Sequence, residues 1–548
     1  MTSTLASSPA PVRIWRPRLS HLQLNLCASA YMLLVLSTGF WERLLGHFPL
    51  LDSRTIVFGF GVLAASVFIQ ELLGPGRLQK PVLALLILAS AGASYYERAF
   101  GVLMDKDMVR NIVETNYTEA SHMVTPRMVA AILLTGVIPA LLVFWPEVRR
   151  VGLVHQLWRW PLAVIASLGL TIGAMFMYFK DYSAMMREAG DPVAAHQPIA
   201  TVKAVFRYGL EQMRGASVEV APYGRDARKG SSLSAAEKPV LMVFFLGETA
   251  RAQSFGLNGY ARNTTPELAR RDVIAFTGTT SCGTSTARSV PCMFSGLGKD
   301  NFTREAGLAR ENLVDVLGHA GVKVEWYENN SGDQNVAVRN GWAMVDKTLD
   351  PVACATECTD EIFLPIIRNA AETITEDTVL VLHMIGNHGP AYYMRYPQER
   401  AVFQPDCRSA QFADCTDEQI VNAYDNAIHE TDYVLAKSID ILAASDRVTP
   451  ALVYLSDHGE SLGESGVYLH ASPVFMAPAE QTRVPFVMWL DPRFETLMGL
   501  DEACLRSRTG APTSQDNLFS SMLGLMDITT TVRNPDLDLT AGCRDRLP

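Results

Sequence analysis

Residues 239–246 read PVLMVFFL. A continuous apolar run of this length, rich in β-branched and aromatic residues, is typical of a strand that is covered on both faces in a parallel sheet. Two later runs have the same character, 378–382 (TVLVL) and 451–455 (ALVYL), and helical patterns intervene at 361–373 and 419–444. Strands that alternate with helices predict an α/β domain.

Carboxylates and imidazoles follow these predicted strands. Glu248 comes after the first run, His383 and His388 after the second, and Asp457 and His458 after the third. Ligands of open α/β sheets bind beyond the carboxyl ends of the strands, and a mixed oxygen and nitrogen shell suits zinc or manganese better than calcium. Each acid alone is explained equally well as a helix cap or a turn residue. Their convergence at one sheet edge favours a metal site.

A hydroxyl-rich loop at 280–292 (TSCGTSTARSVPC) lies between two cysteines and has neither helical nor strand periodicity. Taken alone, it is best explained as a surface loop closed by a disulfide. A hydroxyl becomes a nucleophile when a base or a coordinated cation activates it. A metal held by Glu248, Asp457 and His458 could take the Thr286 hydroxyl as its fourth ligand, which would aim that oxygen at an electrophile.

The N-terminal part of the chain is strongly apolar. The 548 residues are too many for one ordinary domain, and 48% of them are hydrophobic. Five runs are long enough to span a bilayer, at about 22–41, 55–74, 80–97, 126–146 and 160–179. None resembles a cleavable signal peptide. The sequence thus predicts a transmembrane domain of five α-helical spans over 1–180, amphipathic linker helices over 181–238, and a separate domain over 239–548.

Basic residues set the predicted orientation. They cluster before the first run, between the second and third, and between the fourth and fifth (Arg13, Arg16, Arg18; Arg77, Lys80; Arg149, Arg150, Arg159). Loops rich in Lys and Arg are cytoplasmic. An odd number of spans then places everything after about residue 180 on the outer side of the membrane. The net charge of −10 argues against nucleic acid as a partner.

Cysteine usage agrees with this orientation. Cys27 lies in the first apolar run, and the other eight cysteines follow residue 280. An even set in an extracytoplasmic domain predicts four disulfides. A zinc ribbon is disfavoured, because the cysteines do not form paired CxxC knuckles. Nearness in sequence favours the pairs Cys282–Cys292, Cys354–Cys358, Cys407–Cys415 and Cys504–Cys543.

The segment between the third and fourth runs, 105–119, has the pattern of a short helix. Asn111, Thr115 and Glu119 recur every four residues, which places an amide, a hydroxyl and a carboxylate on one helical face. A solvated face of an interfacial helix is the simpler explanation. If the substrate were a lipid headgroup, the same face could hydrogen-bond an ammonium group.

Several motifs together resemble the phosphoethanolamine transferases that modify lipid A, including the mobile colistin resistance enzymes. They lie at 247–251 (GETAR), 280–284 (TSCGT), 289–295 (SVPCMFS), 383–390 (HMIGNHGP), 424–426 (YDN), 456–462 (SDHGESL) and 466–470 (GVYLH). The resemblance covers essentially the whole chain. It implies a multi-pass protein of the bacterial inner membrane whose alkaline-phosphatase-like, sulfatase-like domain, at 239–548, faces the periplasm and depends on zinc.

The resemblance also implies a reaction and its residues. Glu248, Thr286, Asp457 and His458 surround one tightly bound zinc ion, and Thr286 takes phosphoethanolamine from phosphatidylethanolamine as a covalent intermediate. A lipid A phosphate then receives the group, which gives polymyxin resistance. A monomer is expected. Further positions match family residues: His388 and His470 contact the phosphoryl group or a second zinc, and Asn111, Thr115, Glu119, Asn330 and Ser331 line the donor site.

The sequence departs from the family at Gln334, where relatives usually carry Lys. The lost cation would weaken phosphate binding by roughly 1–3 kcal/mol unless Lys323, Arg339 or Arg288 replaces its charge. Three other functions stay open: transfer to another envelope glycan, hydrolysis by the same fold, and binding of lipid headgroups without catalysis. All four metal ligands are present, which places the last of these lowest.

Overall fold

The structure, a computed structural model, describes residues 15–115, 117–149, 152–188, 192–215 and 219–544. The chain divides into two compact units. The first comprises residues 1–98 and 126–203, and the second comprises residues 99–125 and 204–548. A short segment between apolar helices, 99–125, therefore belongs to the same unit as the long C-terminal part of the chain.

The first unit consists of apolar helices. Among the described residues, three are long and apolar enough to cross a membrane: α3 (Ser53–Leu73), the helix Gly76–Phe100 that contains α4 (Gln79–Phe100), and Leu157–Met177 within α9 (Leu153–Met177). Leu162, Ile165 and Phe176 of α9 are exposed, as suits a helix that faces lipid.

The predicted number of five spans is not reached. In place of the first span, α1 (His21–Val35) and α2 (Thr38–Leu45) meet at an angle of 64°, so that they make up to one further span as a bent pair. Between them Ser37 leaves the helical conformation, and its hydroxyl donates back to the Met32 carbonyl at 2.9 Å. The predicted run at 126–146 is a shorter apolar helix, Pro126–Leu142, so the described residues support three to four spans.

The second unit is built on a seven-stranded sheet of order β5-β13-β10-β4-β9-β7-β8. Its five strands from β10 to β8 are parallel, whereas β13 runs antiparallel to β10 and β5 antiparallel to β13. The strands are β4 (Val240–Gly247), β5 (Ile274–Phe276), β7 (Lys323–Glu328), β8 (Ala343–Met344), β9 (Thr378–His383), β10 (Thr449–Ser456) and β13 (Phe486–Leu490).

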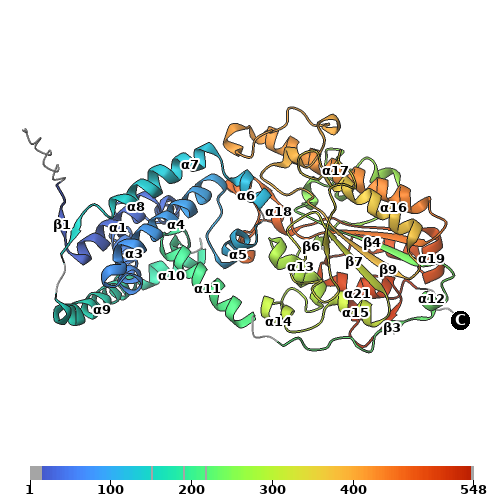
Figure 1. The fold of residues 1–548 in the computed structure, drawn as a ribbon, viewed down its shortest axis with the longest axis horizontal. Coiled ribbons are helices and arrows are strands. Elements are labelled where there is room, and N and C mark those ends of the chain that lie inside the picture. The colour runs from blue at the N-terminus through green and yellow to red at the C-terminus, as the bar shows by residue number, and fades with distance from the viewer. Residues whose placement is uncertain (1–14, 116, 150–151, 189–191, 216–218, 545–548) are drawn as a thin grey trace, which may run out of the picture. The chain divides into compact units, whose positions relative to one another are not determined.

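Helices cover both faces of this sheet (Figure 1). Every residue of β4 is buried, and alternate side chains enter opposite layers. Met242 and Phe244 join one core with residues of α13 (Thr286–Ser295), α15 (Leu313–His319) and α21 (Asp516–Leu525). On the other face Phe245 packs against Phe363, with ring centroids 6.1 Å apart. Phe363 begins α16 (Phe363–Thr373), and α17 (Asp417–Ala443) lies beside it.

The register of the central strands brings their carboxyl ends to one level. Gly247 of β4 lies opposite Ser456 of β10, and Leu246 lies opposite His383 of β9. The next residues along the chain therefore emerge side by side at one edge of the sheet. The same unit contains four disulfides, each between cysteines that are near in sequence: Cys282–Cys292, Cys354–Cys358, Cys407–Cys415 and Cys504–Cys543.

Candidate active site

Three predicted metal ligands meet where β4 and β10 end. Glu248 follows β4, and Asp457 and His458 follow β10; all three are buried, and one ligand atom from each lies within 4.8 Å of the others. His458 Nε2 is 3.4 Å from Glu248 Oε1 and 3.3 Å from Asp457 Oδ2. The convergence inferred from the ends of the apolar runs is thus present in the tertiary structure.

This cluster has the chemistry of a cation site. Asp457 Oδ1 accepts hydrogen bonds from two backbone N–H groups, but Asp457 Oδ2 is buried and has no hydrogen-bond partner among the described residues. Burial and the charge of Glu248 raise the pKa of Asp457 to about 6. When His458 Nδ1 donates to the Gly459 carbonyl at 2.9 Å, its Nε2 lone pair faces the carboxylates. Two carboxylates and an imidazole nitrogen fit zinc.

Thr286 opens helix α13 directly beside this cluster. Its hydroxyl oxygen lies 3.1 Å from Glu248 Oε2 and 3.3 Å from His458 Nε2. The preceding residue, Ser285, is extended and acts as the N-cap without a side-chain hydrogen bond. Backbone N–H groups at the start of a helix also attract anions. The position therefore combines a hydroxyl, the metal cluster and a helix N-terminus.

A second layer of polar side chains holds Glu248. Asn330 donates to Glu248 Oε2 at 2.7 Å and to the Met384 carbonyl at 3.0 Å. His383, at the end of β9, lies between Glu248 and the buried Glu328, whose carboxylate is 3.0 Å from His383 Nδ1. Burial alone would lower the pKa of His383, but the charges of Glu328 and Glu248 raise it to about 10. Asn330 and His383 thus support a metal ligand.

The backbone after β9 passes very close to the same ligand. Gly386 has φ +49°, and a Cβ there would lie 2.5 Å from the Glu248 carbonyl oxygen. Only glycine fits such an approach, because any side chain would collide with the backbone. The next amide, that of Asn387, donates to the Glu248 carbonyl at 3.0 Å.

A small pocket lies over Thr286. Residues from five stretches that are distant in the sequence line it: Asn111, Glu114 and Thr115; Ser285, Thr286 and Ala287; Ser331 and Gln334; His388; and His470. The structure brings together most of the substrate-binding residues that the resemblance implies. Asn330 is the exception among the described side chains, since it contacts Glu248 and is not part of the pocket lining.

The two pocket histidines lie on the open side of the cluster. The His470 ring is 4.5 Å from that of His458 and 5.3 Å from that of His388, centroid to centroid. His470 Nδ1 lies 2.9 Å from Glu460 Oε2, and the Tyr392 hydroxyl donates to Glu460 Oε1 at 2.6 Å. Sequence reasoning did not assign Glu460 a role. Its position in the motif 456–462, two residues after His458, could have indicated that Glu460 lies near the site.

The helix predicted over 105–119 is interrupted. The structure has α5 (Lys106–Glu114) and α6 (Tyr117–Met123), and Thr115 between them is extended with ψ 130°. Thr115 also returns its hydroxyl hydrogen bond to the Asn111 carbonyl. Asn111 and Thr115 still reach the pocket, but the four-residue spacing does not continue on one helix to Glu119. The side chain of Glu119 lies outside the described residues. Glu114, which does not fit the four-residue spacing of Asn111, Thr115 and Glu119, lines the pocket.

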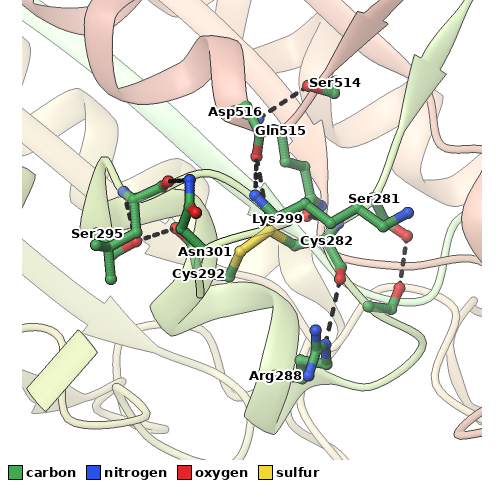
Figure 2. Close-up of a disulfide and its surroundings, with 12 residues drawn as sticks. Ser281, Cys282, Arg288, Cys292, Ser295, Lys299, Asn301, Ser514, Gln515 and Asp516 are labelled. Atoms are coloured by element: carbon green, nitrogen blue, oxygen red, sulfur yellow. Dashed lines mark hydrogen bonds between the residues drawn. A yellow bond between two sulfur atoms is a disulfide. The ribbon is translucent and has the colours of Figure 1, made fainter. Parts of the chain in front are cut away.

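Figure 2 shows the disulfide Cys282–Cys292, which closes the segment containing Thr286, with Gln515 beside it. Gln515 accepts a hydrogen bond from the Cys282 amide at 2.7 Å and donates to the carbonyls of Ser456 and Asp457 at 2.7 and 2.6 Å. This buried glutamine links the segment that carries Thr286 to the end of β10, which Asp457 and His458 follow. Nothing in its local sequence indicated this role.

None of Lys323, Arg339 and Arg288 supplies the pocket with a positive charge in place of the lysine that was expected at Gln334. Lys323 pairs with Glu325 at 2.7 Å, Arg339 with Asp315, and Arg288 donates to the Cys282 carbonyl at 3.3 Å. None of them belongs to the pocket lining. Gln334 itself lines the pocket, with its amide 3.5 Å from the Ser331 hydroxyl.

Comparison with known proteins agrees with this geometry. A sulfatase family profile matches residues 241–528, and a profile described as phosphoethanolamine transferase EptA/EptB matches residues 62–213. Phosphoethanolamine transferase EptA of Salmonella typhimurium is 35% identical over 541 residues, which cover 96% of this chain and 98% of that protein. The chain belongs to the phosphoethanolamine transferase family. Its C-terminal unit is accordingly a sulfatase-like, alkaline-phosphatase-like domain, joined to an N-terminal membrane domain.

Two further family members show the extent of the similarity. Phosphatidylethanolamine transferase Mcr-1 of Escherichia coli is 34% identical, over 87% of this chain and 91% of that protein. Among solved structures, the integral membrane protein lipooligosaccharide phosphoethanolamine transferase A of Neisseria meningitidis matches with a TM-score of 0.91 at 31% identity. That match covers 96% of this chain and 99% of the other. The family fold thus extends through both units.

Proposed function

We propose that this family member transfers phosphoethanolamine from phosphatidylethanolamine to a phosphate group of lipid A, with Thr286 as the nucleophile. The observation that carries the proposal is the position of the Thr286 hydroxyl, 3.1 Å from Glu248 Oε2 and 3.3 Å from His458 Nε2 beneath a polar pocket. Relatives named phosphoethanolamine transferase EptA and phosphatidylethanolamine transferase Mcr-1 match 96% and 87% of this chain, which supports transfer of this group. The protein would work in the bacterial inner membrane with its catalytic unit in the periplasm.

In the first step, the Thr286 oxygen forms a bond to the donor phosphorus and the bond from phosphorus to the diacylglycerol oxygen breaks. The Thr286 hydroxyl proton passes to Glu248 Oε2, which accepts its hydrogen bond at 3.1 Å, and the departing diacylglycerol oxygen accepts a proton from His470. The hydrogen bond of His470 Nδ1 to Glu460 directs the other ring nitrogen toward the pocket. His388 is placed to stabilise charge on the phosphoryl oxygens.

Glu248, Asp457 and His458 would hold one zinc ion beside Thr286. When bound, zinc supplies Lewis-acid chemistry that lowers the pKa of the threonine hydroxyl and offsets negative charge. In the second step a hydroxyl oxygen of a lipid A phosphate attacks the same phosphorus and the bond to Thr286 breaks. His470 takes the proton of the attacking hydroxyl, and the Thr286 oxygen takes back the proton from Glu248. The helix N-terminus at Thr286 favours the negative charge in both steps.

The modification would have a consequence at the membrane surface. Each transfer attaches an ethanolammonium group to an anionic phosphate, which lowers the attraction of cationic peptides for the outer surface. Resistance to polymyxin and colistin is therefore the expected phenotype of expression.

The deciding experiment is intact mass spectrometry of the full-length protein after incubation with phosphatidylethanolamine. We expect a phosphoethanolamine adduct on the wild-type protein and none on Thr286→Ala. Ser289→Ala is the matched control. It removes one hydroxyl from the same helix, and the Ser289 oxygen has no hydrogen-bond partner among the described residues. Lipid A from cells that express each protein is analysed in parallel.

Each result separates two functions. An adduct together with modified lipid A supports the two-step transferase. An adduct with unmodified lipid A keeps the chemistry and redirects the search to another envelope glycan. Release of diacylglycerol without an adduct, unchanged by Thr286→Ala, would contradict the assigned nucleophile and favour a hydrolase.

A further inference from the structure

One acidic residue of the pocket is only partly engaged by the protein. Glu114 ends helix α5 and lines the pocket beside Asn111 and Thr115. Its Oε1 lies 3.5 Å from Arg304 Nη2 and 4.0 Å from Arg110 Nε. Its Oε2 is buried and has no hydrogen-bond partner among the described residues. Within the part of the chain that the structure describes, Glu114 therefore has one buried carboxylate oxygen without a protein partner, which is what a ligand donor could satisfy.

The charged side chains next to Glu114 form ion pairs with one another. Arg110, whose side chain is only 3% exposed, contacts Asp107 at 2.8 Å and Glu211 at 2.6 Å. Lys106 contacts the same two carboxylates at 3.0 and 3.1 Å. Asp107 and Glu211 each contact two cations at 2.6–3.1 Å, whereas Glu114 contacts Arg304 and Arg110 at 3.5 and 4.0 Å through a single oxygen.

Arg304 fixes Glu114 relative to the nucleophile. Its Nη1 donates to the carbonyl of Ala287 at 3.1 Å, one residue after Thr286, and its Nη2 reaches Glu114. Arg304 belongs to α14 (Arg304–Leu308), so one guanidinium connects three segments of the second unit. This bridge links the Glu114 carboxylate to the residue that follows Thr286.

We propose that Glu114 is the specificity-determining residue that recognises the primary ammonium group of the transferred headgroup, and that Arg304 is its positioning residue. The inference rests on the proposed function. An ammonium group has three donors and seeks carboxylate oxygens. A phosphoryl group at Thr286 places the other end of its short alcohol in this pocket. A neutral headgroup would leave the Glu114 oxygen without a partner, and a quaternary headgroup has no N–H to donate.

The test compares phosphatidylethanolamine with phosphatidylethanol, which has the same two-carbon headgroup without the ammonium. The rate of adduct formation on Thr286 is measured by intact mass for both donors in the full-length protein. Hydrogen bonds to charged groups predict that the wild-type protein prefers phosphatidylethanolamine by about 10- to 100-fold. Glu114→Gln should reduce that preference to nearly one by slowing the ethanolamine donor alone.

A second measurement does not require turnover of the neutral donor. Phosphoethanolamine and ethyl phosphate are compared as competitors of the reaction with phosphatidylethanolamine, and Glu114→Gln should remove the advantage of the first. Glu305→Gln is the matched control, because Glu305 is an exposed carboxylate on α14 outside the pocket lining. Arg304→Lys should lower the preference partly, since lysine cannot bridge both partners in the same way.

Three outcomes would overturn the inference. Unchanged donor preference in Glu114→Gln would show that this carboxylate does not bind the ammonium group. An equal loss with both donors would show a structural role. Loss of preference in Glu119→Gln but not in Glu114→Gln would assign the recognition to the other acid. A wild-type protein that forms no adduct from phosphatidylethanolamine would instead refute the proposed function, and this inference with it.

Discussion

The environment of Asp457 suits a bound cation better than it suits the stability of the unliganded fold. It shares a buried space with Glu248, and its Oδ2 has no hydrogen-bond partner among the residues described. Two adjacent buried carboxylates cost free energy unless a cation or a proton compensates them. The raised pKa of Asp457, about 6, has the same cause. Without metal, the site therefore destabilises the folded chain.

This arrangement predicts that Asp457→Asn has opposite effects on stability with and without zinc. In metal-free protein the substitution removes one of two like charges, so the free energy of unfolding should rise by about 1 kcal/mol. With zinc present, the wild-type protein gains about 2.7 kcal/mol at a hundredfold excess over Kd, and the variant, which lacks a ligand charge, should gain less. Thermal unfolding in chelator and in added zinc measures both differences.

Asp536→Asn serves as the control, because this exposed aspartate is far in sequence from the ligands. It should leave both melting temperatures unchanged. If Asp457→Asn destabilised the protein equally in chelator and in zinc, the carboxylate pair would not be a metal site.

At the scale of elements, the segment 282–292 was predicted to have neither helical nor strand structure, but from Thr286 onward it is the start of helix α13. It has to hold the Thr286 hydroxyl at a fixed place. The disulfide Cys282–Cys292 closes it, and Gln515 connects its amide to the end of β10. A second disulfide of similar span, Cys407–Cys415, closes a loop whose cysteines are not in the pocket lining. The two bridges therefore allow stability to be separated from positioning.

We expect that removing either bridge by double Cys→Ala substitution lowers the free energy of unfolding by a similar amount, about 2–3 kcal/mol. Only the loss of Cys282–Cys292 should also slow adduct formation on Thr286, because only that loop carries the hydroxyl. Denaturant unfolding gives the first quantity and intact mass the second. Equal rates in the two variants would mean that Gln515 and helix α13 position Thr286 without the disulfide.

At the scale of the whole molecule, the distribution of paired and free cysteines indicates on which side of the membrane the second unit lies. The eight cysteines of the second unit form four disulfides, and Cys27 of the first unit is free. Disulfides persist in oxidising compartments and are rare in the cytosol. The pattern agrees with a C-terminal unit on the periplasmic side.

The chain should therefore expose one alkylatable thiol when it is denatured without reductant and nine after reduction. Mass spectrometry after alkylation counts these thiols in protein purified from membranes. Three or more thiols before reduction would contradict the complete pairing, and with it the cysteine argument for orientation.

Much of the fold and of the metal cluster follows from the sequence alone. The apolar runs before Glu248, His383 and Asp457 are the central parallel strands β4, β9 and β10, because strands covered on both faces must be continuously apolar. Their parallel order then brings the following residues to one edge. Nearness in sequence likewise favoured all four disulfide pairs, which the structure contains.

The rest was decided by tertiary contacts. Helical spacing predicted Asn111, Thr115 and Glu119 on one face, but the chain leaves the helix at Thr115, and Glu114 lines the pocket instead. Gln515 reaches the ligand strand from a distant helix. The first predicted span is bent by 64° near Ser37, and the described residues contain three to four candidate spans, so the five predicted spans are not confirmed. Periodicity describes which residues share a face of one element. It contains no information on where an element breaks or on what a side chain meets across hundreds of residues, because packing of the folded chain settles both.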